Sequence, residues 1–274
     1  MEAMDPRMSA AYEACRRMQR RHDPTYYWAT RRLPADLQPA THALYGYVRT
    51  ADQIVDGPNR PPTPEARRKA LDAWEDELRR GLAGEEPHPV VGALIDAGER
   101  HALPLDELGT YMRSMRVDCG PVRIKDDAEL DAYMDGSAGS VGRIMARLLD
   151  VPERFHADFG QLGRAFQLAN FIRDVGEDWE LDRIYVPGVD EGDLAGNTPA
   201  LKAAIVEQVR RARAMFASAE PAIGAAPASV RSGIRMACTA YARILDRVEE
   251  LGGDVLGRRV GVRARDVLAI LVQR

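Results

Sequence analysis

The sequence predicts an all-α protein. Apolar residues recur at three- and four-residue spacing along nearly the whole chain, whereas runs that alternate with a period of two are short and scarce. The 274 residues are 45% apolar and 29% charged, which suffices for a sizeable core under a charged surface. No Gly/Ser linker, low-complexity tract or internal repeat divides the chain, so we expect one domain over residues 1–274, with strands minor or absent.

The helices can be placed in order from their spacing and from the residues that stop them. The first is expected over residues 7–21 and the next over residues 39–56, which ends at a Pro-dense loop over residues 57–64. Leu71, Trp74, Leu78 and Leu82 then mark a helix closed by glycine. The remaining helices are expected over residues 88–101, 105–117, 127–149, 153–178, 198–219, 227–251 and 263–273.

Small residues interrupt one of these patterns at residues 136–142, which read GSAGSVG. They permit either a local break and close backbone approach beside a ligand tunnel, or simply tight packing between helices. The sequence leaves both open. We interpret the nearby Met145, Phe166 and Phe171 as core residues rather than cavity walls.

Bulk composition excludes several classes of function. The formal net charge is −4, so nothing in the charge balance indicates a nucleic-acid partner. Cys15, Cys119 and Cys238 are isolated and match no metal spacing, which indicates reduced thiols in a cytoplasmic protein. Residues 1–23 lack the apolar segment of a signal peptide, and the apolar run over residues 267–272 is far too short to span a membrane. A peripheral membrane contact stays open.

Two pairs of aspartates carry the functional signal. Asp52 and Asp56, and then Asp174 and Asp178, recur four residues apart inside expected helices, and Asn170 lies four residues before Asp174. Four residues is just over one turn, so each pair emerges on one helix face, about 6 Å apart along the axis. Like charges at this spacing destabilise an isolated helix. A single pair is most simply a solvated surface feature, but two such pairs favour a cation between them.

Polar stripes surround both pairs. On the first helix the polar, or wet, stripe lies at relative positions 0, 4, 7 and 11, which are Tyr45, Arg49, Asp52 and Asp56. On the second helix the wet stripe is Gln167, Asn170, Asp174 and Asp178. That helix also has an apolar, or dry, stripe, which is Leu168, Ile172 and Val175. Oxygen ligands without nearby Cys or His indicate Mg²⁺, and Arg offers a planar donor fork suited to phosphate. The sequence therefore predicts a magnesium and polyphosphate site between two helices.

These motifs resemble those of the phytoene/squalene synthase family, the head-to-head prenyl synthases. The resemblance runs from about residue 12 to the C-terminal end. It rests on residues 26–34 (YYWATRRLP), 42–56 (HALYGYVRTADQIVD), 133–142 (YMDGSAGSVG), 167–178 (QLANFIRDVGED), 183–187 (RIYVP), 241–246 (YARILD) and 258–260 (RRV). The N-terminal segments look closest to bacterial phytoene synthases.

The resemblance implies a fold, a reaction and a set of site residues. The fold is an isoprenoid-synthase-type helical bundle around a central cavity. The reaction is head-to-head condensation of two prenyl diphosphates, with Mg²⁺-assisted loss of diphosphate. The bacterial match favours two geranylgeranyl diphosphates, which give phytoene through prephytoene diphosphate.

Site residues carry over by position. Asp52, Asp56, Asn170, Asp174 and Asp178 match the metal-binding positions. Diphosphate-binding positions correspond to Tyr45, Arg49, Gln167, Tyr241 and Arg258, with His22 and Thr25 in an N-terminal clamp. The four aspartates and Arg49 are expected to carry catalysis.

Two departures from the family pattern keep alternatives open. Gln53 replaces an aspartate that the family often has beside Asp52, and the clamp reads His22-Asp23-Pro24-Thr25 where small hydroxyl residues and a Lys are usual. The clamp change removes a cation and adds a carboxylate, which would weaken binding of a second diphosphate. The alternatives are a squalene- or dehydrosqualene-type synthase using farnesyl diphosphate, and a cyclase acting on one prenyl diphosphate. A non-catalytic relative would have lost metal ligands, and this chain keeps each of them.

Overall fold

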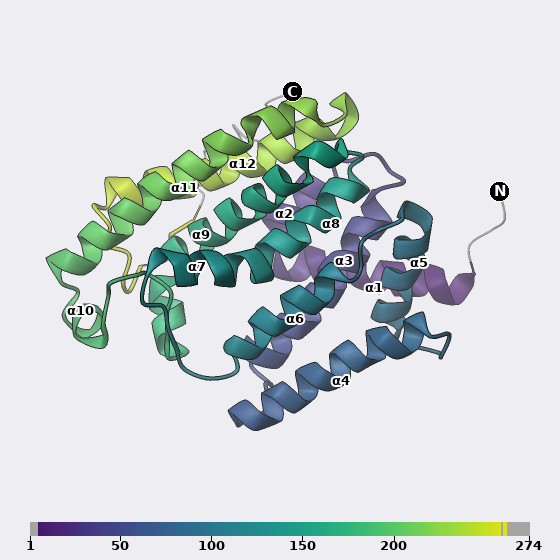
Figure 1. Ribbon diagram of the computed structural model, residues 1–274, viewed down its shortest axis with the longest axis horizontal. Helices are drawn as coiled ribbons and strands as arrows, with labels where there is room; N and C mark the ends of the chain where they lie inside the picture. The colour runs from purple at the N-terminus through teal and green to yellow at the C-terminus, as the bar shows by residue number, and fades with distance from the viewer. Residues whose placement is uncertain (1–4, 259, 262–274) are drawn as a thin grey trace.

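One long helix, α9 (His156–Glu180), runs through the middle of the molecule (Figure 1). Among the α-helices, it packs most extensively against α8 (Ser140–Leu148), α11 (Pro199–Ala225) and α12 (Ala228–Glu250). The structure is a computed structural model that describes residues 5–258, 260 and 261, except for the side chain of Thr25. The helix expected over residues 263–273 lies outside the described residues.

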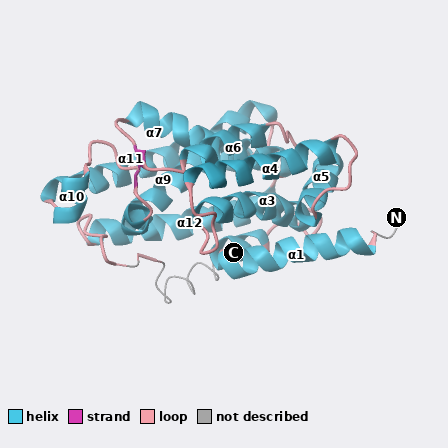
Figure 2. Cartoon of the chain, turned by 90° about the horizontal axis from the view of Figure 1, so that it is seen from below, coloured by secondary structure: helices cyan, strands magenta, loops and turns pink. Residues whose placement is uncertain are grey.

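The other elements are arranged around this helix, with α1 along one edge and a small strand pair at the opposite end (Figure 2). In chain order they are α1 (Pro6–His22), α2 (Pro24–Thr30), α3 (Gln38–Asp56), α4 (Pro64–Leu82), α5 (Pro89–His101), α6 (Glu107–Val117), β1 (Val122–Arg123), α7 (Asp127–Met134), the π-helix η1 (Asp135–Gly139), the 3₁₀-helix η2 (Glu153–Phe155), β2 (Arg183–Ile184) and α10 (Glu191–Gly196).

The all-α prediction is confirmed. Within the described part of the chain, the strands are the two-residue segments β1 and β2, which pair in parallel with Val122 opposite Arg183. This short ladder matters because it joins the end of α6 to the end of α9. It therefore places Arg183 beside the aspartate-bearing helices.

Helix starts follow a common local chemistry. Several helices begin with proline directly after a residue whose side chain accepts a backbone N–H, and proline suits this position because its missing N–H would be unpaired there. These pairs are Asp5-Pro6, Asp23-Pro24, Thr63-Pro64, His88-Pro89 and Thr198-Pro199. This signal places the start of α4 at Pro64, seven residues before the first apolar position that marked it in the sequence.

Other expectations needed correction. The short helices α2 and α10 were not expected, because six or seven residues show too little periodicity. The single helix expected over residues 127–149 is α7, η1 and α8 in succession. The π-helix η1 falls on the small-residue segment, so the local break is present.

Close packing is present there too. A Cβ built on Gly163 would lie 2.4 Å from the carbonyl oxygen of Ala138, and one on Gly142 would lie 2.4 Å from that of Phe159. Only glycine lets the two backbones approach this closely. The segment over residues 136–142 therefore both interrupts the α-helix and packs tightly against α9.

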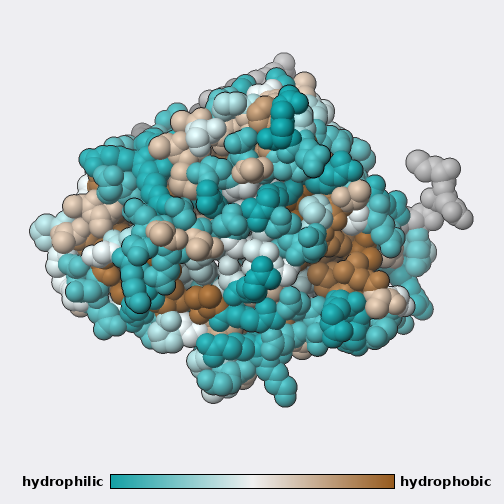
Figure 3. Space-filling view, viewed as in Figure 1, coloured by the Kyte–Doolittle hydropathy of each residue, from teal (hydrophilic) through white to brown (hydrophobic). Residues whose placement is uncertain are grey.

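Buried apolar side chains form two large clusters, one mainly from α1, α3, α5, α6 and α8 and the other mainly from α7, α9, α11 and α12. The dry stripe on α9 is confirmed, since Leu168, Ile172 and Val175 are all buried in the second cluster. The face shown in Figure 3 is mostly hydrophilic, with a hydrophobic area near α5. Among the described helices, none is long and apolar enough to cross a membrane.

A buried polar network fixes α2 against α1 and α3. His42 Nδ1 lies 2.5 Å from Gln19 Oε1, and Gln19 Nε2 donates to Thr30 Oγ1 at 3.1 Å. All three side chains are nearly inaccessible, with His42 3% exposed. Burial, with the nearby Arg16 charge, lowers the pKa of His42 to about 4, so the imidazole is neutral at pH 7.

This network predicts acid sensitivity. In the unfolded chain His42 takes up a proton near pH 6.5, but in the folded protein it does so only near pH 4. Its contribution to stability is therefore complete above pH 6.5 and is lost as the pH falls toward 4. Denaturant unfolding of wild type and His42→Gln at pH 7 and pH 5 should show a smaller acid-induced loss in the variant. His101→Gln, outside the network, should behave as wild type; equal losses in wild type and His42→Gln would contradict the assignment.

Candidate active site

Arg183 is the hub of the aspartate region. Its Nη2 lies 2.6 Å from Asp56 Oδ1 at the end of α3, and donates to the carbonyl oxygen of Asp118 at 2.6 Å. The side chain is only 4% exposed. Its positive charge also lowers the pKa values of Asp52 and Asp178 from what burial alone would produce. Arg183 thus ties the first aspartate helix to the end of the second.

Tyrosine hydroxyl groups donate hydrogen bonds to two carboxylates of this region, those of Asp52 and Asp118. Tyr111 donates to Asp52 Oδ1 at 2.7 Å, and Tyr185 donates to Asp118 Oδ1 at 2.7 Å. Tyr133 donates to the other Asp118 oxygen. Asp118 is 5% exposed, so this buried carboxylate has its partners within the protein.

The carboxylates of this region resist ionisation. Burial raises the pKa of Asp52 to about 6, against the opposing hydrogen bond from Tyr111, and burial likewise raises that of Asp118 to about 6. Burial and the neighbouring charge of Asp174 raise the pKa of Asp178 to about 8. Strongly raised acid pKa values in a cleft are a mark of functional sites. A divalent cation would favour the charged forms.

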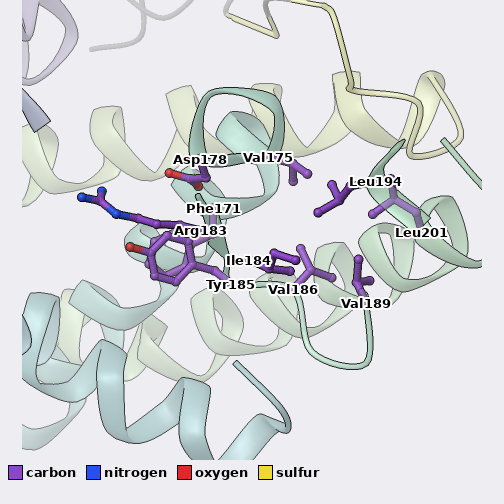
Figure 4. A pocket seen from close by; sticks show the side chains of 10 residues that line it. All are labelled: Phe171, Val175, Asp178, Arg183, Ile184, Tyr185, Val186, Val189, Leu194 and Leu201. Atoms are coloured by element: carbon purple, nitrogen blue, oxygen red, sulfur yellow. The ribbon is translucent and has the colours of Figure 1, made fainter. Parts of the chain in front are cut away.

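The polar side of this region is visible in Figure 4. Asp178, Arg183 and Tyr185 direct their polar ends to the same side, while Val189, Leu194 and Leu201 lie on the other. The void between them has a volume of only about 10 Å³. It has room for about one water molecule, so it is not the substrate cavity.

The second aspartate helix carries its own arginine. Arg173 Nε donates to Asp174 Oδ1 at 2.6 Å. One turn earlier, the Oδ1 atom of Asn170 is buried and has no hydrogen-bond partner among the described residues. An unpartnered buried acceptor beside two carboxylates is suited to a cation.

A larger cavity of about 300 Å³ lies beside Asn170. Its polar end carries four of the predicted residues, Tyr45, Gln167, Asn170 and Tyr241, and the hydroxyl of Tyr241 is hydrogen-bonded to Asn170. The rest of the wall is mainly apolar, from α2, α3, η1, α8, α9 and α12. Phe166 and Met145 line this cavity, so the expectation that they are core residues rather than cavity walls was wrong. Both also pack against the hydrophobic core. Phe171 is buried, as expected.

The cavity is deep along α9. Its lining runs from Asn170 to Phe159, eleven residues apart, which corresponds to about 16 Å at the rise of an α-helix. A volume near 300 Å³ lies at the lower end of the usual range for ligand pockets. Asp52, Asp56, Asp174 and Asp178 do not line the cavity. Its polar end instead reaches Tyr45 and Asn170, which precede Asp52 on α3 by seven residues and Asp174 on α9 by four.

The N-terminal clamp lies at this polar end, but with a different chemistry from that expected. Asp23 caps α2, since its Oδ1 accepts from the backbone N–H of Tyr26 at 2.8 Å, and it also lines the cavity. The carboxylate therefore has a structural role in placing the cavity wall. His22 Nε2 lies 3.3 Å from Nε2 of Gln53, which is on α3, the first aspartate-bearing helix. The Thr25 side chain lies outside what the structure describes.

Two predicted arginines differ in their placement. Arg49 Nη1 is 4.0 Å from Asp52 Oδ2, and its Nε is buried without a partner among the described residues, leaving a donor for a ligand. Arg258 is exposed and pairs with Asp254 in its own loop, 3.2 Å away. That loop nevertheless crosses α9, because the N atom of Gly257 lies 3.7 Å from a Cβ built on Gly176.

The sequence reasoning did not assign a role to Tyr111, Asp118, Arg173 and Arg183. Tyr111 and Asp118 lie seven residues apart, on one face of α6 and its end, and that spacing could have signalled them. Arg173 and Arg183 belong to the quoted motifs, but their partners come from tertiary packing.

The donor set fits a hard divalent cation. Carboxylate and amide oxygens face the region from α3 and α9, and no thiolate or imidazole is required. Among the described residues, no three acidic, histidine or cysteine side chains already converge on one point. Asp56 is paired with Arg183, and Asp174 is paired with Arg173.

Comparison with known proteins agrees with this geometry. Residues 19–266 match the squalene/phytoene synthase family. The chain is 33% identical to the phytoene synthase of Thermus thermophilus, over 95% of this chain and 91% of that one. It is 31% identical to the phytoene synthase of Arthrospira platensis, over 93% and 89% of the two chains.

Solved structures show the same fold. A dehydrosqualene synthase in complex with a ligand superposes with a TM-score of 0.85 at 21% identity, over 96% of this chain and 95% of that one. A squalene synthase from Alicyclobacillus acidocaldarius gives 0.80 at 25% identity, over 89% and 95%.

A helical bundle with an apolar cavity beside an acidic mouth defines an isoprenoid-synthase-type enzyme. This chain belongs to the squalene/phytoene synthase family and is a prenyltransferase that condenses prenyl diphosphates head to head.

The hub predicts a large stability effect. Arg183→Met keeps much of the side-chain volume but leaves Asp56 and Asp118 without their buried counter-charge. Breaking a fully buried ion pair costs roughly 3–5 kcal/mol. Because the Asp56 side chain is 42% exposed, the free energy of unfolding at pH 7 should fall by somewhat less, about 2–3 kcal/mol. Arg123→Met, which breaks the more exposed ion pairs of the neighbouring strand, should cost about 1 kcal/mol or less. If Arg183→Met lowers the free energy of unfolding no more than Arg123→Met does, the buried charge of Arg183 is not needed for stability.

Proposed function

We propose that this enzyme condenses two molecules of geranylgeranyl diphosphate to phytoene through prephytoene diphosphate, with Mg²⁺ as cofactor. The observation that carries the proposal is the joining of two features: a cavity of about 300 Å³ with mainly apolar walls, and an acidic mouth formed by two helices. The identity of 31–33% to two phytoene synthases, over 93–95% of this chain, supports the longer substrate.

The residues at the mouth bind and orient the diphosphate. Asp52, Asp56, Asn170, Asp174 and Asp178 would hold the cation, which supplies charge neutralisation for the leaving diphosphate. Arg49 presents a free guanidinium donor from the same face as Asp52. Tyr45, Gln167 and Tyr241 line the boundary between mouth and cavity, where they can orient the first carbons of the chain.

Two further arginines lie beside carboxylates that would hold the cation. Arg183 is paired with Asp56, and Arg173 is paired with Asp174. The planar guanidinium fork suits phosphate oxygens, so these two side chains would bind the diphosphate beside the cation.

The apolar wall carries the remainder of the reaction. Ionisation of an allylic diphosphate leaves a carbocation, which water would quench to an alcohol. Side chains such as Val141, Leu162 and Phe166 exclude water from this part of the cavity. The wall therefore protects the cation until the second prenyl chain reacts.

The clamp bears on whether one or two substrates bind. Asp23 is engaged as the cap of α2, so its charge is partly satisfied by backbone N–H groups instead of facing the diphosphate alone. His22 of the clamp lies 3.3 Å from Gln53 on α3, and the charge of Arg49 on the same helix acts on its imidazole. This favours two-substrate condensation over cyclisation of a single diphosphate.

Metal-ligand variants test the acidic mouth. Asp52→Asn and Asp174→Asn should each reduce kcat by roughly a hundredfold or more, the order seen when one preorganised charge-stabilising group is lost. Both should keep the wild-type circular dichroism spectrum, because removing one carboxylate relieves like-charge repulsion. EDTA should inhibit reversibly, and Zn²⁺ should restore activity poorly because the site lacks N and S ligands.

Asp76→Asn serves as the control, since Asp76 is an exposed residue of α4 that pairs with Arg79 of the same helix. It should retain full activity. Near-wild-type turnover of Asp52→Asn or Asp174→Asn at ordinary Mg²⁺ would remove these helices from the site.

Product analysis tests the substrate. Purified enzyme supplied with Mg²⁺ and equal amounts of geranylgeranyl and farnesyl diphosphate should yield mainly a C40 hydrocarbon, as the similarity to phytoene synthases suggests. A predominant C30 product, with or without NADPH, would indicate the squalene- or dehydrosqualene-type reaction. A cyclic C20 hydrocarbon would indicate a cyclase.

A further inference from the structure

Ser137 carries a buried hydroxyl group that faces the substrate cavity. Its side chain is only 8% exposed, and its Oγ atom has no hydrogen-bond partner among the described residues. Ser137 belongs to the π-helix η1 and lines the cavity together with Ala138 and Val141. Short π-helical segments inside longer helices are frequent at functional sites. A buried hydroxyl without a partner destabilises a fold, so a contact with a bound molecule would account for it.

Other helical hydroxyl groups of this protein are satisfied by the backbone. Five of them donate to the carbonyl oxygen four residues earlier, at 2.6–3.0 Å; they are Thr30, Thr41, Thr50, Ser140 and Thr239. For Ser137 the equivalent acceptor is the carbonyl oxygen of Tyr133, which instead accepts from the hydroxyl of Ser114 on α6 at 3.3 Å. Ser114 therefore occupies the acceptor that would draw the Ser137 hydroxyl away from the cavity.

The position of Ser137 along the cavity follows from the contacts between η1 and α9. A Cβ built on Gly163 would lie 2.4 Å from the carbonyl oxygen of Ala138, and one on Gly160 would lie 3.4 Å from that of Gly139. The two segments therefore run in opposite directions. Ser137 precedes Ala138, so it lies on the side of Ala138 that is nearer to the polar end of the cavity.

This places the hydroxyl close to the reacting end of a bound substrate. Gln167, at the polar end of the cavity, follows Gly163 by four residues, which corresponds to about 6 Å along α9. The diphosphate group is expected at that end, so carbons C1 to C3 of the prenyl chain would lie beside Ser137.

We propose that Ser137 is a catalytic residue whose hydroxyl oxygen stabilises the allylic cation formed when diphosphate leaves. The bond between C1 and the diphosphate oxygen breaks, and both electrons leave with the diphosphate. The positive charge is then shared by C1 and C3, and the lone pairs of Oγ face it without forming a bond or moving a proton. A dipole that is already oriented is effective because it need not reorganise during the reaction.

The neighbouring polar groups of the wall are engaged elsewhere. Thr30 Oγ1 donates to the carbonyl oxygen of Tyr26, and the Tyr26 hydroxyl lies 3.8 Å from the sulfur of Met145. All three residues line the cavity. Ser137 therefore differs from Thr30 and Tyr26 in that its hydroxyl has no partner within the described part of the protein.

Binding of unreactive analogues tests the proposal without turnover. The probe for the cation is an aza analogue of geranylgeranyl diphosphate with a protonated tertiary amine at C3, and the probe for the uncharged chain is the thiodiphosphate. Ser137→Ala should weaken binding of the aza analogue by about tenfold and change that of the thiodiphosphate by less than about twofold. Farnesyl forms of both probes should show the same difference, so the result does not depend on the proposed chain length. Equal effects on the two probes, or none on either, would overturn the proposal.

Single-turnover kinetics test the same residue during the reaction. Ser137→Ala should slow diphosphate release by about tenfold or more and leave KM unchanged, because the contact strengthens only as the cation forms. The variant should also melt at the same or a higher temperature than wild type, since it loses a buried hydroxyl without a partner. A slower reaction together with a lower melting temperature would indicate a structural role instead.

Ser140→Ala is the matched control, since it also removes a serine hydroxyl from this wall. The Ser140 hydroxyl donates to the carbonyl oxygen of Gly136, and Ser140 does not line the cavity. The variant should melt at a lower temperature but release diphosphate within about twofold of the wild-type rate. If it slows the reaction as much as Ser137→Ala does, the effect belongs to the helix and not to the Ser137 hydroxyl.

Ser114→Ala tests how the hydroxyl is directed into the cavity. It frees the carbonyl oxygen of Tyr133, toward which the Ser137 hydroxyl can then turn, so diphosphate release should slow. That effect should disappear when Ser137→Ala is already present. A Ser114→Ala effect of equal size in both backgrounds would contradict the proposal. It also fails if Ser137→Ala only lowers the yield of a prenyl alcohol at an unchanged rate, because the hydroxyl would then hold a water molecule that quenches the cation.

Discussion

The need to hold several carboxylates together in a half-buried site governs this structure. Asp52, Asp118 and Asp178 come from different parts of the chain, and burial raises the pKa of each. Arg183 offsets this cost from the centre, and tyrosine hydroxyl groups offset it from behind. The parallel strand pair of β1 and β2 places Arg183 beside these carboxylates. An arginine thus places positive charge between the acidic helices.

The long helix α9 divides the molecule into a wet side and a dry side. Its buried stripe anchors the second core cluster, and its polar stripe faces the cavity mouth. Glycines at positions 142 and 163 allow η1 and α8 to approach α9 closely. Both glycines also line the cavity, so part of its wall carries no side chain.

The predictable part of the site is the part that is local in sequence. The spacing of Asp52 and Asp56, and of Asn170, Asp174 and Asp178, follows from helix geometry alone. Tyr45, Gln167 and Tyr241 were expected near the diphosphate, and the structure brings all three to the cavity. Arg258 pairs with Asp254 of its own loop. Among the described residues it has no ion pair with the aspartates of α3 and α9. The capping role of Asp23 was not expected, because a cap depends on the helix that follows, and α2 is too short to show a period.

The sequence by itself determined the helical class, the dry and wet faces of α9, and the acidic motifs, because each depends on residues within a few turns of one helix. Only the tertiary structure decided which charges meet. Arg183 contacts Asp56 across 127 positions of sequence, and Tyr111 contacts Asp52 across 59. The size of the cavity was also decided there, since it depends on how closely separate helices pack. Periodicity reports the direction in which a side chain faces, but not the partner that packing brings to it.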